Sequence, residues 1–78
     1  MDGLVLLKDM KPGQRGEVRT FTGEPGCKFR LMEMGLLPGT EVRFVRRAPL
    51  GDPMQVEVRG FQLSLRQEEA ACIGIAVA

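Results

Sequence analysis

Apolar and polar residues alternate most clearly in the second half of the chain. Between Met54 and Arg59, and again between Phe61 and Arg66, every second residue is apolar and those between are polar. Because successive side chains of a strand point to opposite faces of a sheet, this alternation predicts two strands, each with one buried and one solvent-exposed face. Gly60 separates the runs and predicts a tight turn that makes them a hairpin.

Three shorter segments with the same character predict further strands. They lie at residues 16–21, 40–46 and 73–77, and the last has small residues on its second face, which suits a strand packed on both sides. Residues 4–7 are extended and apolar enough to add an edge pairing.

One segment follows a helical period instead. Cys27, Leu31 and Met34 recur at i, i+4 and i+7 and form one apolar stripe. Gly35 follows where a left-handed residue ends a helix, so we expect Leu36 to fold back onto Leu31.

The order of these elements predicts a mainly β fold. Pro38-Gly39 predicts a type II turn after the helix, and residues 67–71 predict a second helical turn. Short strands with little helix must protect their edges, and closure into a barrel does so. We therefore predict one domain over residues 1–78: a small β-barrel of about five strands, with one short α-helix between the first and second barrel strands.

Composition and charge narrow the range of partners. The chain is 44% hydrophobic and 27% charged, which is ordinary globular composition. A net charge of +1 argues against nucleic acid as the main partner, because phosphate binding requires clustered basic residues. No run approaches the roughly 20 apolar residues of a membrane span, and no signal-peptide core is present. We expect a cytoplasmic protein without direct membrane insertion.

The chain offers little material for catalysis or metal binding. It contains no histidine, the commonest general base and transition-metal ligand. Cys27 and Cys72 lie far apart in sequence and predict reduced, partly buried side chains, with metal binding as the minority interpretation. The carboxylates show no ligand spacing and no phosphate-binding loop is present. We predict a non-enzymatic protein with no cofactor; iron association would lack a visible ligand set.

Exposed apolar and basic residues remain as candidates for binding a protein partner. The apolar candidates on or after the predicted helix lie off its apolar stripe. The apolar candidates at residues 48–53 lie on a loop rich in proline and glycine. The arginines form a small basic cluster. Each group has a structural alternative: a helix cap, a tight strand connection or a solvated strand face. The candidates are Phe29, Met32, Leu37, Arg46, Arg47, Pro49 and Leu50.

Three motifs resemble the FeoA family, in the same order along the chain. Its helix-to-strand element is similar to residues 30–42 (RLMEMGLLPGTEV), its central loop to residues 48–53 (APLGDP), and its C-terminal hairpin and closing strand to residues 60–66 (GFQLSLR) with Glu68-Glu69-Ala70 and Ile73. Each motif alone is weak, but together they make a strong match from about Leu4 to Val77.

The resemblance implies an SH3-like barrel and a cytosolic accessory protein of bacterial ferrous iron uptake. The implied partner is the FeoB-type membrane transporter with its GTP-binding domain. A contact combining Phe29, Met32, Leu37 and Leu50 is expected, and two strand edges would permit a homo-oligomer.

Two other functions stay open. The same fold forms the C-terminal domain of iron-dependent repressors, so a metal- or peptide-responsive regulatory domain is an alternative. We expect the stand-alone module, because no winged-helix segment precedes it. A third hypothesis is stimulation of GTP hydrolysis through Arg46 or Arg47 acting as an arginine finger.

Overall fold

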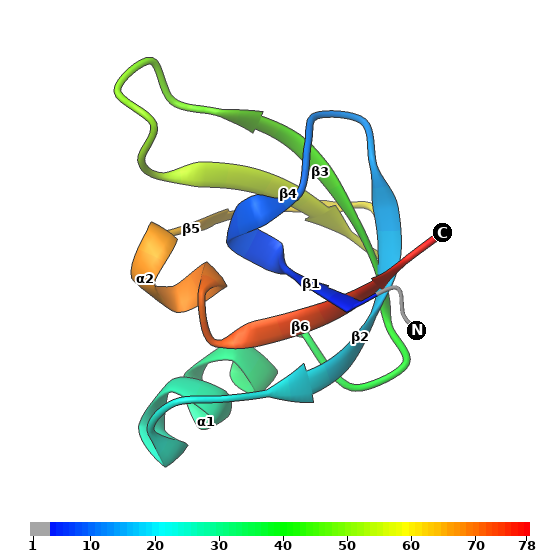
Figure 1. Cartoon of the computed structure of the whole chain (residues 1–78), viewed down its shortest axis with the longest axis vertical. Helices are drawn as coiled ribbons and strands as arrows, with labels where there is room; N and C mark the ends of the chain where they lie inside the picture. The colour runs from blue at the N-terminus through cyan, green and yellow to red at the C-terminus, as the bar shows by residue number, and fades with distance from the viewer. Residues whose placement is uncertain (1–3) are drawn as a thin grey trace.

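A single antiparallel sheet accounts for every strand in the computed structural model, which describes residues 4–78. The sheet curls around the core, with two short helices beside it (Figure 1). The strand order is β1-β6-β2-β3-β4-β5. The elements are β1 (Leu4–Leu6), the 3-10 turn η1 (Leu7–Asp9), β2 (Arg15–Phe21), α1 (Pro25–Glu33), β3 (Glu41–Arg47), β4 (Met54–Val58), β5 (Phe61–Leu65), α2 (Gln67–Ala70) and β6 (Ile73–Val77).

The mainly β prediction is confirmed, with the edge strand as the sixth member. β1 pairs with β6, so that Leu4 lies opposite Ala76. The short helix does lie between the first two of the five strands expected from the longer segments, β2 and β3. Within residues 4–78, neither helix has the length and apolar character that a membrane span requires.

The predicted β4–β5 hairpin turns at Arg59 and Gly60. Both residues have positive φ, 53° and 84°, the signature of the type I′ turn that matches the twist of a two-residue hairpin. Val58 lies directly opposite Phe61 across the turn, so the two share a face. Val58 is buried there, but Phe61 is 73% exposed because it lies at the tip of the edge strand.

The helix ends as its sequence predicted. The Leu36 N–H donates to the Leu31 carbonyl (3.1 Å) and the Gly35 N–H to the Met32 carbonyl (3.0 Å), the paired bonds of a Schellman motif. Gly35 has a φ of 101°, which a residue with a side chain would rarely adopt. Leu31 and Leu36 are fully buried, so the end of α1 is fixed in the core.

The core is formed by the inner face of the sheet, the end of α1 and η1. Its largest fully buried side chains are Phe44, Leu7, Met10, Leu31, Leu36, Met54, Leu65, Ile73 and Ile75. β2 and β6 approach closely at Gly16, where a Cβ would clash with the Ile75 side chain and lie 2.7 Å from the Ala76 carbonyl oxygen. This close approach lets the sheet curl tightly.

Candidate functional site

The loop between β3 and β4, residues 48–53, presents the most exposed large apolar side chain of the described chain. Leu50 is 96% exposed at its tip. The Gly51 N–H donates to the Ala48 carbonyl (2.7 Å), and the Ala48 N–H donates to the Pro53 carbonyl (2.9 Å). These bonds close a turn with Pro49 at the position where its fixed φ is favourable. Leu50 is therefore held outward by an ordered loop.

Asp52 ties this β3–β4 loop to α2. Its Oδ1 accepts a hydrogen bond from the Gln67 N–H (2.9 Å), which satisfies a free amide in the first turn of that helix. Its Oδ2 lies 3.6 Å from Nη1 of Arg66. The loop and α2 are thus held together, although they are separate in the sequence.

The predicted helix residues lie on a second surface. Phe29 is 66% exposed and lines a shallow hollow together with Phe21 and Pro25. Met32 and Leu37 are partly buried. Only Phe29 is therefore a strongly exposed apolar residue at α1.

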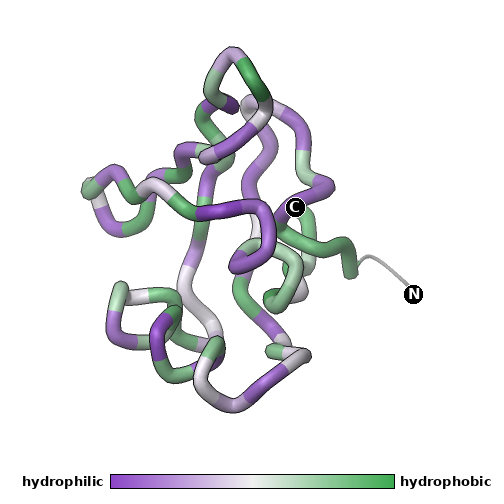
Figure 2. Tube along the Cα trace, turned by 90° about the vertical axis from the view of Figure 1, so that its left-hand side faces the viewer, coloured by the Kyte–Doolittle hydropathy of each residue, from purple (hydrophilic) through white to green (hydrophobic). Residues whose placement is uncertain are grey.

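The β3–β4 loop and α1 lie far apart in the fold. In Figure 1 the β3–β4 loop stands at the top and α1 at the bottom, and the view in Figure 2, turned by 90°, keeps them at opposite ends. One contact combining Phe29, Met32, Leu37 and Leu50 would therefore have to span the molecule, and it stays a prediction. The closed sheet separates the loop from the helix, a distance that the sequence does not reveal.

The predicted basic residues have different surroundings. Arg47 Nη2 donates to the carbonyls of Lys8 (2.6 Å) and Met10 (3.3 Å), and its guanidinium stacks 4.8 Å from the centre of the Phe44 ring. Arg47 thus secures η1 to the sheet. Arg46 is exposed and its Nε donates to Oε1 of Gln55 (2.7 Å). Of these two arginines, only Arg46 is exposed.

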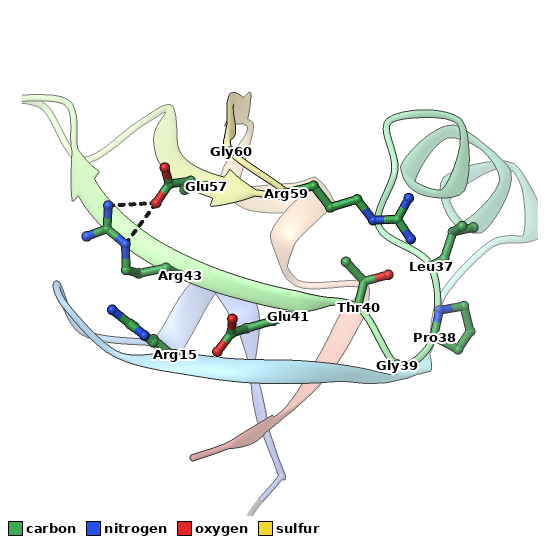
Figure 3. Close-up of a pocket in the computed structure, with 10 residues that line it drawn as sticks. All are labelled: Arg15, Leu37, Pro38, Gly39, Thr40, Glu41, Arg43, Glu57, Arg59 and Gly60. Atoms are coloured by element: carbon green, nitrogen blue, oxygen red, sulfur yellow. Dashed lines mark hydrogen bonds and ion pairs between the residues drawn. The ribbon is translucent and has the colours of Figure 1, made fainter.

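A groove that the sequence did not predict runs beside Leu37. It has a volume of about 670 Å³, and Figure 3 shows the Arg59 side chain reaching across it toward Leu37. On its far wall, Arg43 donates to Oε1 of Glu57 through Nε (3.0 Å) and Nη2 (2.8 Å). The groove combines Leu37 and Pro38 with charged side chains of both signs, among them Arg59 and Glu41. In the sequence, Gly60 indicated a turn, but it did not indicate the direction of the Arg59 side chain.

α1 and α2 meet at an ion pair. Arg30 Nη1 lies 2.9 Å from Oε2 of Glu69, whose side chain is only 13% exposed. Glu69 Oε1 also accepts a hydrogen bond from the Arg66 N–H (2.9 Å). The bond from the Arg66 backbone, and secondly the Arg30 guanidinium, lower the pKa of the Glu69 carboxyl. No group of three or more cysteine, aspartate or glutamate residues within 4–78 is arranged to hold a metal ion.

Comparison with known proteins identifies relatives over almost the whole chain. The model of the FeoA domain family matches residues 5–77. A fusion protein of Fe(2+) transport protein A and Fe(2+) transporter FeoB from Porphyromonas gingivalis is 30% identical over 69 residues. Those residues are 88% of this chain but only 8% of the fusion protein.

Solved structures agree with the fold. The FeoA protein of Chlorobium tepidum is 38% identical, with a TM-score of 0.84 over 94% of this chain and 70% of the other. FeoA of Stenotrophomonas maltophilia, a prokaryotic SH3 domain protein solved with zinc, is 25% identical, with a TM-score of 0.80 over 95% of both chains. The predicted SH3-like fold is confirmed. A manganese-dependent transcriptional repressor shares the fold at 15% identity, with a TM-score of 0.88 over 44% of its length.

Proposed function

The chain belongs to the FeoA family, and from this premise we propose that it is an accessory protein of ferrous iron transport that binds an FeoB-type membrane transporter. The observation that carries the proposal is the Porphyromonas gingivalis relative, in which a segment 30% identical to this chain is fused to FeoB. Fusion keeps a module at high effective concentration beside its neighbour, which is useful when the two bind each other.

The proposed action is binding in the cytoplasm, without catalysis by this chain. A bound accessory protein can change a transport cycle only if it binds one transporter state more tightly than another, because equal binding to all states shifts no population. The proposal therefore requires a contact surface whose counterpart on the transporter changes between states.

We place the main contact at the β3–β4 loop. Leu50 is 96% exposed, and the hydrogen bonds around it fix the loop before any partner arrives. An ordered loop loses little conformational entropy on binding, which favours affinity. The loop is also anchored to α2 through Asp52. Phe29 on α1 marks a second, separate surface.

The test compares two matched apolar-to-acidic variants at the opposite ends of the molecule. Full-length transporter in lipid nanodiscs is titrated with wild-type protein, Leu50→Asp and Phe29→Asp. Burying a charge in place of a central apolar contact is expected to weaken binding of Leu50→Asp by about 30-fold, equivalent to about 2 kcal/mol. Phe29→Asp should bind as the wild type does, and circular dichroism should show that both variants are folded.

Each result bears on a different part of the proposal. Loss of binding in Phe29→Asp alone would move the contact to α1. Full binding by both variants would show that neither surface is the contact. Wild-type protein that does not bind the transporter at all would reject transporter binding itself.

The two alternative functions gain no comparable support. The manganese-dependent repressor is only 15% identical in sequence, so its similarity to this chain concerns the fold alone. An arginine finger would need a free guanidinium, but that of Arg47 is engaged by two backbone carbonyls. Arg46 is exposed, and its Nε donates to Gln55.

A further inference from the structure

The fold brings together two cysteines that lie far apart in the sequence. Cys27 is in the first turn of α1, and Cys72 lies between α2 and β6. Both are free, partly buried and packed against the core. The Cys72 Sγ donates to the Glu68 carbonyl (3.4 Å) and lies beside Gly23, just before α1. Burial first, and then the neighbouring Cys72 thiol, raise the pKa of Cys27 to about 11.

Neighbouring contacts hold α1 against the segment that carries Cys72. Arg30 follows Cys27 by three residues on α1, and Glu69 precedes Cys72 by three, so their 2.9 Å ion pair runs alongside the thiol pair. The Cys72 carbonyl also accepts a hydrogen bond from the Thr22 N–H (2.7 Å), just before α1. These contacts place Cys72 beside the start of α1, the turn that carries Cys27.

Space and access at the pair suit a reaction. At Gly23 an added Cβ would lie 3.2 Å from the Cys72 Sγ, so the glycine leaves room for that sulfur. Cys27 lines an open hollow of about 360 Å³, which a small reagent can enter. The ionisable groups around this hollow are Glu24, Arg30, Arg66, Glu68 and Glu69.

We propose that Cys27 and Cys72 are a reversible dithiol–disulfide site, which a low-molecular-weight disulfide oxidises to a covalent link between α1 and the start of β6. The Cys27 thiolate attacks one sulfur of the reagent, forms a mixed disulfide and releases one small thiol. The Cys72 thiolate then attacks the Cys27 sulfur, forms the protein disulfide and releases the second small thiol. The two cysteines lose two electrons and two protons, and the reagent disulfide is reduced to two thiols.

This site goes beyond the proposed transport function and does not depend on it. The link would close a loop running from residue 27 to residue 72 and fix α1, which carries Phe29, to the sheet. Closing a loop of this size restricts the unfolded chain, so the oxidised protein should melt roughly 10 °C or more above the reduced protein.

The test treats the folded, full-length chain with glutathione disulfide between pH 7 and pH 10. The expected product is a monomer lighter by two hydrogen atoms, with no free thiol after denaturation and with the peptides containing Cys27 and Cys72 joined. Because the pKa of Cys27 is raised to about 11, its thiolate fraction, and the initial rate, should rise about tenfold per pH unit across this range.

Single variants supply the control. Cys27→Ser and Cys72→Ser should each stop at one thiol or one attached glutathione. The proposal is overturned if the wild-type chain also stops with glutathione attached, forms only disulfide-linked dimers, or keeps both thiols. It is equally overturned if the mixed disulfide, once formed, closes to the internal disulfide no faster in the folded chain than in urea, since the fold would then not pair the thiols.

Discussion

At the scale of single residues, Arg59 occupies a backbone position that suits other residues better. Its φ of 53° lies in the left-handed region, where asparagine and glycine are favoured and arginine is not. Its side chain extends over the groove toward Leu37 (Figure 3). A residue that is kept in an unfavourable conformation beside a groove is a candidate for contact with a partner.

Replacing this arginine should stabilise the fold. Arg59→Asn supplies the residue that type I′ turns prefer and should raise the free energy of unfolding by about 0.5–1 kcal/mol in urea denaturation. The control Gly60→Ala, at a φ of 84°, should lower it. An Arg59→Asn variant that is less stable than the wild type would mean that the groove contacts of Arg59 outweigh the strain.

At the scale of elements, the junction of α1 and α2 depends on one carboxylate. Glu69 caps α2 through the Arg66 N–H and pairs with Arg30 of α1. Both interactions favour the charged form, so the pKa of Glu69 in the folded protein lies below its ordinary value of 4.5. The stabilisation is complete above that ordinary value and is lost as the pH falls through the lowered one.

Glu69→Gln should therefore show a stability loss that depends on pH. At pH 7 the free energy of unfolding should fall by about 1 kcal/mol, a value limited by solvent screening because Arg30 is largely exposed. The difference between variant and wild type should shrink below pH 4, when the wild-type carboxylate is protonated as well. Chemical denaturation from pH 3 to pH 7 measures it; a difference that is constant with pH would contradict an ionic cause.

Elements defined by neighbouring residues were predictable from the sequence, and long-range contacts were not. The hairpin at Gly60, the α1 cap at Gly35 and the type II turn, in which the Thr40 N–H bonds the Leu37 carbonyl (3.0 Å), all depend on local rules of backbone conformation. The thiol pair and the Arg47 contacts with η1 depend on how the sheet closes. No local pattern contains that information.

At the scale of the whole molecule, closure of the sheet depends on the approach of β2 to β6. At Gly16 an added Cβ would clash with the Ile75 side chain and lie 2.7 Å from the Ala76 carbonyl oxygen, so any side chain there must push the two strands apart. The Leu50 loop and α1 keep their positions at opposite ends only while this closure holds.

Gly16→Ala should consequently destabilise the whole fold. Overpacking at this point is expected to lower the free energy of unfolding by about 1–3 kcal/mol, measured by urea denaturation. The matched control is Gly26→Ala in α1, where an added Cβ meets nothing within 4 Å and should stabilise the helix by about 0.5–1 kcal/mol. Equal effects of the two changes would refute tight packing at Gly16.

The pairing of Leu4 with Ala76 has a practical consequence for handling the protein. The start of β1 and the end of β6 lie side by side, on the side of the molecule opposite the β3–β4 loop in Figure 1. A fluorescent label, a surface-coupling tag or a longer polypeptide attached after Ala78 would therefore point away from Leu50. Sensors and immobilised forms built in this way should keep the loop open to solution.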